Sequence, residues 1–456
     1  MSLTSLLQEH KKFILPKNLK MVLNSLWEKG FEAYTVGGCV RDMLMEKSVD
    51  DYDVCTCALP QEVKKCFLDY KVIETGIKHG TVTVIVDEDK FEITTFRSES
   101  DYLDKRHPQK LKFETELKKD LSRRDFTMNA IAYSEKTGIV DLFDGKKDIE
   151  NKVIKTVGDA RERYSEDCLR LLRAVRFASV LGFEIDDKDA IKELSNTIKY
   201  ASKERQSAEL KKLIMGDFAS KTIFENKELF FEIIPQLKDA FLCTQEIIFH
   251  KYNVLEHSLK SLEYCSKNMH LRVAMLLHDI GKPACKTMDE NNCSHFKGHD
   301  KVGEKIAREI LTNLRFSNDE TKYICDLILE HNQAIPSTEI EILTLFRRLT
   351  KEKTLLLLEM IYCDTMGKSD VAKTQEKEKS IKALELAKKL EDKCYKISQL
   401  KINGEDLKKI GFYGEKIGKT LNLLLDLVIA EKTLNEHTEL INVAKNYKWI
   451  NCMFFW

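Results

Sequence analysis

The character of the chain changes near residue 160, and this change constrains the fold more than any other feature of the sequence. Before it, short strand-like runs alternate with turns. Those runs are residues 31–36, 53–57, 81–86, 91–96 and 139–143. After it, Leu-rich periodicity of the helical kind continues to the end of the sequence, and only three of the six prolines occur there. The pattern therefore predicts an α+β head, in which a mixed sheet carries helices, followed by a long all-α region.

Two segments of the head lack strand-like alternation. Residues 1–30 carry Leu and Trp at three-to-four spacing, which predicts a helix. Residues 98–112 are polar and charged and include a proline, so we expect a mobile loop there.

Composition excludes several classes of protein. The 456 residues include 74 Lys and Arg against 74 Asp and Glu, so the net charge is zero and any nucleic-acid surface must come from local basic patches. Thirteen scattered cysteines without a CxxC pair favour reduced thiols in a cytosol. The longest apolar runs, such as residues 355–358 and 423–430, are too short to span a bilayer, and charges at positions 9, 11 and 12 interrupt any signal-peptide core. We expect a cytoplasmic protein without a membrane partner.

A glycine turn follows the first strand-like run. Gly37 and Gly38 let the backbone approach a ligand closely, and a helix that starts near Val40 offers free N–H groups to a phosphate. Arg41 lies at the start of that helix and would add a charge-assisted contact. A Gly-Gly pair is also common in plain turns, so the motif gains meaning only from its surroundings.

Two aspartates come next along the chain. In a strand, Asp51 and Asp53 share a face because side chains at i and i+2 point the same way. Two like charges this close need a counter-ion, and Mg²⁺ is typically held by one or two carboxylates together with substrate phosphates. Glu92, in the run FEITTF, is either a third carboxylate of this site or a surface residue. For the tetrapeptide DDYD alone, a solvated turn is the alternative.

Two basic clusters complete the set of candidate residues in the first 180 positions. Arg123 and Arg124, with Asp125 to orient one of them, are suited to hold a triphosphate and a ribose; a charged helix start is the alternative. The second cluster lies in EDCLRLLRAVRFA, where Asp167 and Arg170 are i,i+3 neighbours if the segment is one helix.

The same helix would carry one basic stripe, formed by Arg170, Arg173 and Arg176. An ordinary amphipathic helix with a salt bridge would also explain this pattern.

The motifs GGCVRD, DDYD, EITTFRSES, RRDFTMNAIA and EDCLRLLRAVRFA occur in this order over residues 35–178. Together they resemble the bacterial tRNA nucleotidyltransferase (CCA-adding enzyme) and poly(A) polymerase family, whose head is polymerase-β-like. The segment MEKSVDDYD lacks the glycine that the family usually has after RDxLL, a departure that should alter only the turn. The resemblance implies two sets of site residues. The catalytic set is Asp51, Asp53 and Glu92, with Mg²⁺ on the two aspartates; the nucleotide-binding set is Gly37, Gly38, Arg41, Arg123, Arg124, Asp125, Asp167, Arg170, Arg173 and Arg176.

Hydrogen-bond chemistry supports a base-reading role for Asp167 and Arg170. Cytosine and adenine each present an acceptor nitrogen beside an amino donor, whereas uracil and guanine present the reverse pattern. An arginine, which only donates, beside an aspartate, which only accepts, therefore fits C and A and rejects U and G. Rejection arises because buried mismatched groups stay unpaired, at about 1–3 kcal/mol each.

A second centre is indicated by histidines, seven of which lie between residues 250 and 331. The order His257, His278-Asp279 and Asp364 resembles the signature of HD metal-dependent phosphohydrolases, which implies a divalent metal of unknown identity on these four residues. An eroded domain without metal is the alternative.

Four other histidines of this stretch were weighed. His299 and His331 are either ligands of a second metal or surface and capping residues, and His250 and His295 carry no assignment.

The resemblance continues through INGEDL and GFYGEKIGK, so it covers nearly the whole chain. It implies four parts: a nucleotidyltransferase head over 1–150, a helical neck with base recognition over 151–240, an HD domain over 241–370 and a tRNA-binding helical tail over 371–456.

From these features we expect template-independent addition of CCA to the 3′ end of tRNA from CTP and ATP, with Mg²⁺ and release of pyrophosphate. The segment from Ser98 to Pro108 would close over the nucleotide, and the HD site would add phosphoester hydrolysis. The alternatives are a poly(A) polymerase, an enzyme that adds only CC or only A, and a protein that is mainly a phosphohydrolase or nucleotide binder. No obligate protein partner is indicated.

Overall fold

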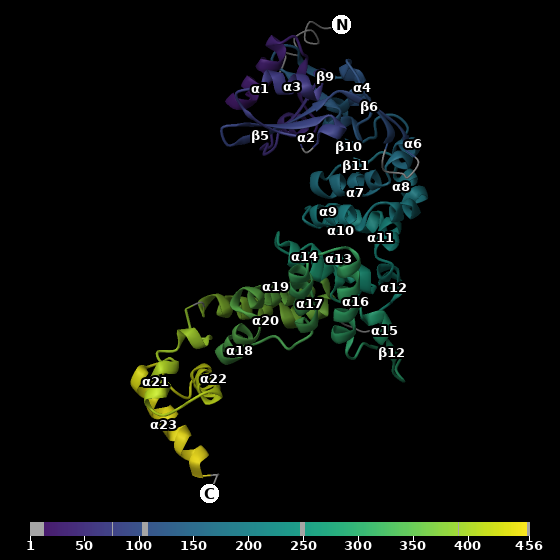
Figure 1. Ribbon diagram of the computed structural model, residues 1–456. Coiled ribbons are helices and arrows are strands. Elements are labelled where there is room, and N and C mark those ends of the chain that lie inside the picture. Colours follow the sequence, from purple (N-terminus) through teal and green to yellow (C-terminus); the bar gives the residue numbers. More distant parts are fainter. Residues whose placement is uncertain (1–12, 75, 103–107, 247–250, 391, 454–456) are drawn as a thin grey trace. The chain divides into compact units, whose positions relative to one another are not determined.

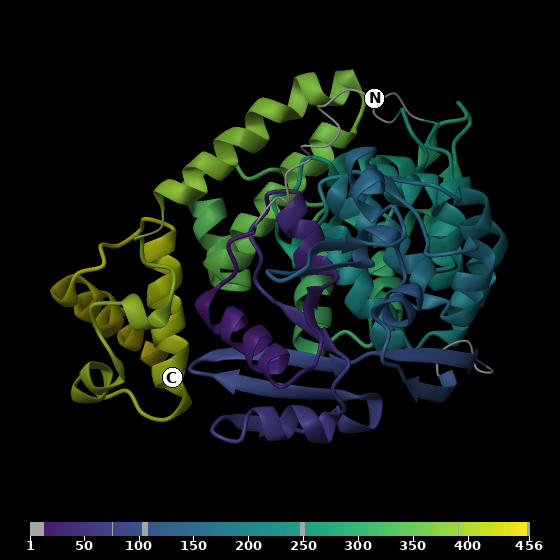
Figure 2. The same ribbon diagram turned by 90° about the horizontal axis from the view of Figure 1, so that it is seen from above.

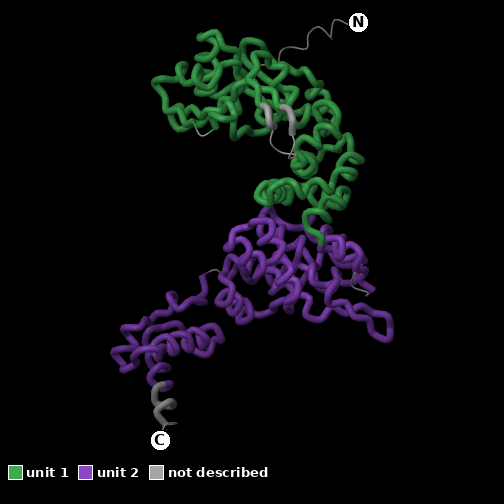
Figure 3. Tube along the Cα trace, turned by 45° about the vertical axis from the view of Figure 1, so that its right-hand side comes forward, with its two compact units in different colours: residues 1–235 green, residues 236–456 purple. Residues whose placement is uncertain are grey.

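The structure is a computed structural model that describes residues 13–74, 76–102, 108–246, 251–390 and 392–453. The chain divides into two compact units, residues 1–235 and 236–456 (Figure 3). Each unit is described by itself below. Among the described residues no helix is long and apolar enough to cross a membrane.

A seven-stranded mixed sheet forms the head, in the order β3-β4-β5-β2-β1-β8-β9 (Figure 1). β2 and β5 are parallel, and every other neighbouring pair is antiparallel. The strands are β1 (Ala33–Val36), β2 (Asp53–Thr56), β3 (Lys71–Ile73), β4 (Thr81–Val86), β5 (Asp89–Thr95), β8 (Ile131–Ser134) and β9 (Gly138–Asp141). This arrangement confirms the α+β head with a mixed sheet.

Both faces of the sheet are covered, because alternate side chains of its central strands enter two separate cores. Val54 of β2 belongs to the larger core, which also takes the apolar face of α1, while Cys55 belongs to the smaller core below α4. The helices of the head are α1 (Lys17–Glu28), α2 (Gly38–Leu44), α3 (Pro60–Cys66), α4 (Leu117–Ser122) and α5 (Gly145–Glu150), with short 3₁₀ turns η2 (Ile77–His79) and η3 (Thr127–Asn129). Asp53 shares the face of Cys55, so its side chain lies on the side where α4 ends.

The prediction of a loop over residues 98–112 is wrong for its described part. β6 (Arg97–Tyr102) and β7 (Pro108–Phe113) form a two-stranded antiparallel sheet. Polar residues on both faces hide the alternation that identifies a strand, and the backbone ladder forms regardless of them. Residues 103–107, the centre of the segment predicted to close over a nucleotide, lie outside the described residues.

The rest of the first unit is helical, as predicted (Figure 1). A short parallel pair joins β10 to β11 across α7. These elements are β10 (Val153–Ile154), α6 (Ala160–Glu166), α7 (Leu169–Leu181), β11 (Glu184–Ile185), α8 (Lys188–Leu194), η4 (Ser195–Tyr200), α9 (Lys203–Ile214), α10 (Ala219–Glu225) and α11 (Lys227–Ile233). α9 packs along α7, which places charged residues of the two helices face to face.

The second unit begins with a helical bundle around the histidine-rich segment. Its elements are α12 (Gln236–Leu242), α13 (Val254–Leu262), α14 (Met269–Leu277), α15 (Lys282–Cys285), β12 (Thr287–Met288), β13 (Ser294–His295), α16 (His299–Asn313), α17 (Asn318–Glu330), α18 (Glu339–Leu349) and α19 (Lys351–Gly367). α13 packs against α14 and α19, and α17 against α14 and α16, so residues from all five helices meet at one place.

The tail follows one long helix, α20 (Asp370–Lys389), which packs on α19 and leads out of the bundle (Figure 2). An ion pair between Arg347 of α18 and Asp426 joins the bundle to the tail. The tail elements are η5 (Ile397–Gln399), α21 (Gly404–Lys409), α22 (Glu415–Ile429) and α23 (His437–Met453).

Candidate nucleotide site and metal centre

Asp53, the first residue of β2, and Glu92, in the middle of β5, lie side by side on two neighbouring parallel strands. They are register partners of β2 and β5, so their side chains share one face, and both are exposed. Asp51 precedes β2, so the prediction that Asp51 and Asp53 both belong to a strand is wrong. The strand-like run predicted over residues 53–57 begins where β2 begins, so only the extension of the strand back to Asp51 is wrong. Asp51 still lies close enough for its charge to act on Asp53.

At Gly37 the backbone comes close to the side chains of Asp53 and Arg124. Its φ of 87° lies in the left-handed region, and a Cβ there would be 3.0 Å from Nη1 of Arg124 and 4.0 Å from Oδ2 of Asp53. Partial desolvation raises the pKa of Asp53; Arg124 opposes this rise, and the charges of Glu92 and Asp51 add to it. The turn predicted to approach a ligand closely is thus adjacent to the carboxylates.

Arg41 is fixed by the protein before any ligand arrives. Its Nη1 donates to Oδ1 of Asn129 at 2.8 Å, and its Nε and Nη2 donate to the carboxylate of Asp42 at 2.8–2.9 Å. Gly38, at the start of α2, lies against this guanidinium, because a Cβ there would be 3.6 Å from Nη2. Sequence reasoning did not identify Asn129, although it lies within the motif RRDFTMNA.

Arg123 and Arg124 are oriented by Asp120 rather than by Asp125, so the predicted partner was wrong. Asp120 has no exposed side-chain area, and its two oxygens accept from Arg123 at 2.8 Å and Arg124 at 3.1 Å. The i,i+3 and i,i+4 spacing of these residues at the end of α4 is a signal that was available in the sequence. Asp125 instead accepts from Arg173 of α7 at 2.6 Å.

The Asp125–Arg173 pair predicts an acid-sensitive contribution to stability. Burial would raise the pKa of Asp125, but Arg173 and Asn129 lower it from 3.8 to about 2. Because the folded-state pKa is depressed, the contribution is complete above about pH 4 and is lost as the pH falls towards 2. Asp125→Asn is therefore expected to lower the free energy of unfolding by about 2 kcal/mol at pH 7 and by about half as much at pH 3, as measured by urea denaturation.

The matched control for this prediction is Asp189→Asn, which changes an exposed aspartate of α8 in the same unit. It should leave the stability at both pH values within a few tenths of a kcal/mol of the wild type. A loss in Asp125→Asn that is the same size at pH 3 and pH 7 would contradict the assignment.

The prediction that Asp167 and Arg170 are neighbours on one helix is wrong: the main-chain N–H of Arg170 donates to the carbonyl oxygen of Asp167 at 2.9 Å, but their side chains bind other partners. α6 ends at Glu166 and α7 begins at Leu169, so Asp167 lies in extended backbone between two helices. Arg170 is buried, and its Nη1 donates to Glu166 at 2.5 Å and to the carbonyl oxygen of Arg163 at 2.9 Å. A helix break inside EDCLR carries no proline or glycine to mark it, which is why the pattern missed it.

Two arginines of the predicted basic stripe, Arg173 and Arg176, form ion pairs with Glu209 of α9. Glu209 is buried and accepts from Arg176 at 2.9 Å and from Arg173 at 3.4 Å. The guanidiniums of Arg41 and Arg176 lie 5.0 Å and 3.5 Å from the centroid of the Phe177 ring. One aromatic side chain thus links an arginine of the head to an arginine of the neck.

The histidine-rich segment forms a compact cluster in the second unit. Nε2 of His257 lies 2.8 Å from Oδ1 of Asp364, and Nε2 of His278 lies 3.2 Å from Oδ2 of Asp279 and 3.4 Å from Oδ1 of Asp364. All four predicted HD residues therefore meet, although α19 is far in sequence from α13 and α14.

His299 and His331 join this cluster on the other side of Asp279. Their Nε2 atoms lie 3.3 Å and 3.6 Å from Oδ1 of Asp279, whereas His257 and His278 lie near Oδ2. Each set places three potential ligand atoms within 4.8 Å of one another. Within the described residues these are the two sets that meet that criterion; the head carboxylates do not. One carboxylate thus joins two potential metal positions.

Local hydrogen bonds orient these rings. Nδ1 of His278, His299 and His331 lies 2.8, 2.8 and 2.6 Å from a main-chain carbonyl oxygen, which makes Nδ1 the donor of that bond and turns Nε2 towards the centre. His295 lies apart on β13, where it pairs with Asp289. His250 lies outside the described residues.

The electrostatics of the cluster fit a metal. Burial disfavours the charged form of His278, but Asp279 and Asp364 raise its pKa to about 10. Nε2 of His278 is buried and has no hydrogen bond of good geometry, and Oδ2 of Asp279 is buried with the ammonium group of Lys282 at 2.7 Å. Imidazole nitrogens and carboxylate oxygens in a buried site are a suitable donor set for a divalent transition metal.

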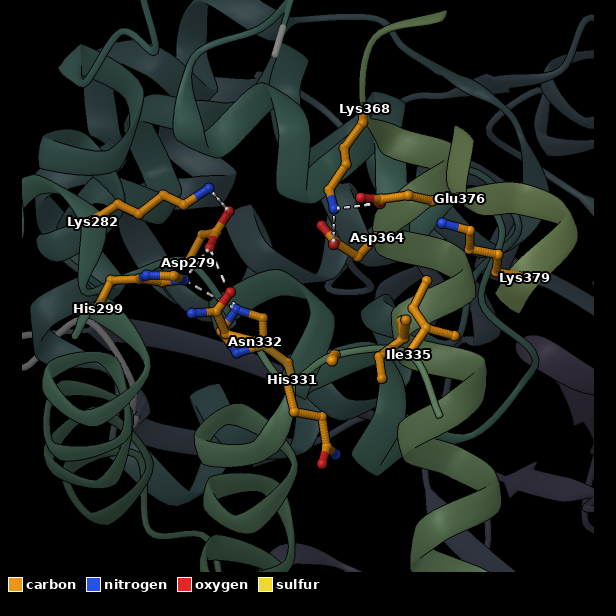
Figure 4. Close-up of a pocket in the computed structure, with 13 residues that line it drawn as sticks. Asp279, Lys282, His299, His331, Asn332, Ile335, Asp364, Lys368, Glu376 and Lys379 are labelled. Atoms are coloured by element: carbon orange, nitrogen blue, oxygen red, sulfur yellow. Dashed lines mark hydrogen bonds and ion pairs between the residues drawn. The ribbon is translucent and has the colours of Figure 1, made fainter. Parts of the chain in front are cut away.

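A cavity of about 420 Å³ opens beside the cluster (Figure 4). Lys282 contacts Asp279 at 2.7 Å, and Lys368 contacts Asp364 at 3.0 Å and Glu376 of α20 at 3.0 Å. Lys379 also lines the cavity. Lys282 and Lys368 thus offset the charge of the carboxylates that they bind, and Lys379 adds a third ammonium group to the cavity.

Two family models match the chain. The poly A polymerase head domain matches residues 33–155, and the HD domain matches residues 254–364. The first range contains the carboxylates of β2 and β5, and the second begins at α13 and ends at Asp364.

Curated relatives match part of the chain. The chain is 48% identical over 204 residues to the CCA-adding enzyme of Leuconostoc citreum, covering 44% of this chain and 50% of the relative. It is 45% identical over 222 residues to the CCA-adding enzyme of Staphylococcus epidermidis, covering 48% and 53%. The chain thus spans about half the length of the curated relatives it matches.

The fold is also similar to a solved structure over nearly its whole length. The Bacillus stearothermophilus CCA-adding enzyme in complex with CTP aligns with 96% of this chain and 99% of its own, with 25% identity and a TM-score of 0.69.

Proposed function

We propose that the chain, which matches the poly A polymerase head domain over residues 33–155 and the HD domain over residues 254–364, adds CCA to the 3′ end of tRNA. The reaction joins the 3′-hydroxyl of RNA to the α-phosphate of CTP or ATP and releases pyrophosphate. The single observation that carries the proposal is that Asp53 of β2 and Glu92 of β5 are register partners. Asp53 also lies beside Gly37 and Arg124.

The residues around Asp53 have distinct tasks in the proposed reaction. Asp53, with Asp51 and Glu92 nearby, provides the oxygen ligands for Mg²⁺. When bound, the ion neutralises charge on the triphosphate and lowers the pKa of the attacking hydroxyl. The turn at Gly37 leaves room for phosphate oxygens near the backbone, and Arg124, held by Asp120, presents a fixed positive charge.

The base is selected by the neck. Asp167 accepts and Arg170 donates, which matches the edge shared by cytosine and adenine. Arg170 uses Nη1 for Glu166 and the Arg163 carbonyl and one Nη2 hydrogen for the Arg123 carbonyl. Three of its five N–H groups are therefore engaged, which fixes the plane of the guanidinium and leaves two for a base.

Asp167→Asn is expected to relax base selection. An amide offers a donor as well as an acceptor, so it can pair with the carbonyl oxygen of uracil that the carboxylate rejects. We expect the ratio of kcat/KM for CTP over UTP to fall about tenfold, as measured by single-nucleotide extension of a tRNA that lacks CCA. Reversing the charges of both Asp167 and Arg170 is a poorer test, because it would bring like charges together at Arg205 and Glu166.

The control for this variant is Asp189→Asn on α8, which should keep the wild-type ratio. An Asp167→Asn protein that rejects UTP as strongly as the wild type would show that this carboxylate does not read the base.

The HD site supports a second proposed activity, hydrolysis of a phosphoester. The specific observation in its favour is that Asp279 belongs to two complete ligand sets that border a cavity of about 420 Å³. A pair of bound metals would supply a hydroxide at neutral pH. Lys282 and Lys368 provide positive charge near the phosphate of a substrate.

The proposed transfer activity is tested by supplying one labelled nucleotide at a time to tRNAs that end before, within and after CCA. We expect C to be added to a tRNA that ends before CCA and A to be added to a tRNA that ends in CC. A tRNA that already ends in CCA should accept neither nucleotide. Long A tails would favour a poly(A) polymerase, and extension by C alone or A alone would indicate a partial enzyme. No extension of any acceptor would leave the HD hydrolase as the main activity.

A further inference from the structure

Asp167 is held by an arginine from another helix, which nothing in the sequence motif indicates. Arg205, in the first turn of α9, donates from Nη2 to Oδ2 of Asp167 at 2.8 Å and from Nη1 to Oδ1 at 3.4 Å. The carboxylate is mostly buried, with 17% of its side chain exposed, and Arg205 is 30% exposed. A two-pronged contact of this kind sets the rotation of the carboxylate plane as well as its position.

The remaining contacts decide which oxygen can reach a ligand. Oδ1 also accepts from the main-chain N–H of Leu169 at 3.1 Å, so both of its lone-pair directions are engaged. Oδ2 accepts only from Arg205 within the part of the chain that the structure describes. One acceptor direction of Asp167 is thus left for a nucleobase, and Arg205 determines where it points.

The rest of α9 reinforces this geometry. Glu209 lies one helical turn after Arg205 on the same face and binds Arg173 and Arg176 of α7. These ion pairs fix α9 to α7 at a second point. They therefore help to keep Arg205 beside Asp167.

We propose that Arg205 is a specificity-determining positioning residue, which fixes Oδ2 of Asp167 as the single acceptor for the amino group of cytosine or adenine. This inference rests on the proposed nucleotidyltransferase function. Without Arg205 the carboxylate turns about χ2, which has broad minima, and its free acceptor no longer faces the base. The loss affects recognition of the correct base more than the transfer of the nucleotide.

The test compares Arg205→Met, Arg205→Lys and the control Arg161→Met in extension of a tRNA that lacks CCA. Arg161 is an arginine of the same unit that pairs on the surface with Glu193 and Asp187. We expect Arg205→Met to raise KM for CTP and to lower the CTP-over-UTP ratio of kcat/KM about tenfold, with a smaller change in kcat. Arg205→Lys, which contacts one oxygen only, should recover part of the ratio, and Arg161→Met should match the wild type.

The outcomes separate the positioning role of Arg205 from the proposed nucleotidyltransferase function. An unchanged ratio in a folded Arg205→Met protein, judged by its melting curve, would overturn the positioning role while the proposed function stands. If Arg205→Met does not fold, the lysine variant decides, since an unchanged ratio there overturns the role too. A wild-type protein that extends no tRNA would refute the proposed function and this inference together.

Discussion

Replacing Asp53 by asparagine is expected to lower nucleotide transfer about a thousandfold while the head stays folded. Asp53 begins β2 beside Glu92, and its carboxylate lies close to Arg124 and the Gly37 turn. The amide keeps the size of the side chain but removes the charge that the proposed Mg²⁺ site requires. The rate is measured by addition of labelled C to a tRNA that ends before CCA, at saturating CTP and Mg²⁺.

Two comparisons make this prediction specific. Asp69→Asn changes an exposed aspartate of the head, between α3 and β3, and should retain the wild-type rate. The partial desolvation that raises the pKa of Asp53 also makes the asparagine variant at least as stable as the wild type. A variant that unfolds at the wild-type temperature yet transfers C at the wild-type rate would exclude Asp53 from catalysis.

Asp279→Asn is expected to abolish metal binding by the HD cluster, with affinity lowered at least about a hundredfold. Asp279 is the one residue common to both ligand sets, so its loss removes a charged ligand from each. We expect metal retained after dialysis, measured by elemental analysis, to fall to background and phosphoester hydrolysis to be lost with it. Transfer of nucleotides to tRNA should persist, because the head carboxylates belong to the other unit.

The control for this variant is Asp289→Asn. Asp289 is an aspartate of the same unit that binds His295 near the surface, and its loss should leave the metal content unchanged. Metal retained at the wild-type level by Asp279→Asn would contradict the assignment of the cluster.

The sequence predicted five of the seven strands of the head sheet, because their signal is local, but missed β3 and β8. Alternating Thr and Val over residues 81–86 correspond to β4, and the apolar run at 53–57 corresponds to β2. The β6–β7 pair was missed because its stability comes from pairing between two polar segments, which no single window of sequence displays. The four-part division of the chain stays a prediction.

The residues of the site were predicted more completely than their partners. Chemistry-bearing residues such as Asp53 and His278 stand out by type and spacing. Their partners Glu209 and Arg205 lie about 35 to 40 positions from the residues they bind and look like ordinary charges of an exposed helix. Only packing of α9 on α7 brings them together, so their roles follow from tertiary structure.

The HD cluster was also predicted only in part from the sequence. The order of its ligands was readable because the adjacent His278 and Asp279 form a compact motif. The position of His299 and His331 was left open in the sequence, since a histidine at the start or end of a helix is often a capping residue. Their approach to the second oxygen of Asp279 depends on how α16 and α17 pack.

The central claim is most directly tested by measuring the mass of a tRNA that lacks CCA after reaction with the protein, CTP, ATP and Mg²⁺, together with the pyrophosphate released. The account predicts growth by C, C and A, then a stop, with one pyrophosphate for each nucleotide added. Consumption of CTP and ATP without growth of the tRNA, or release of phosphate in place of pyrophosphate, would contradict it.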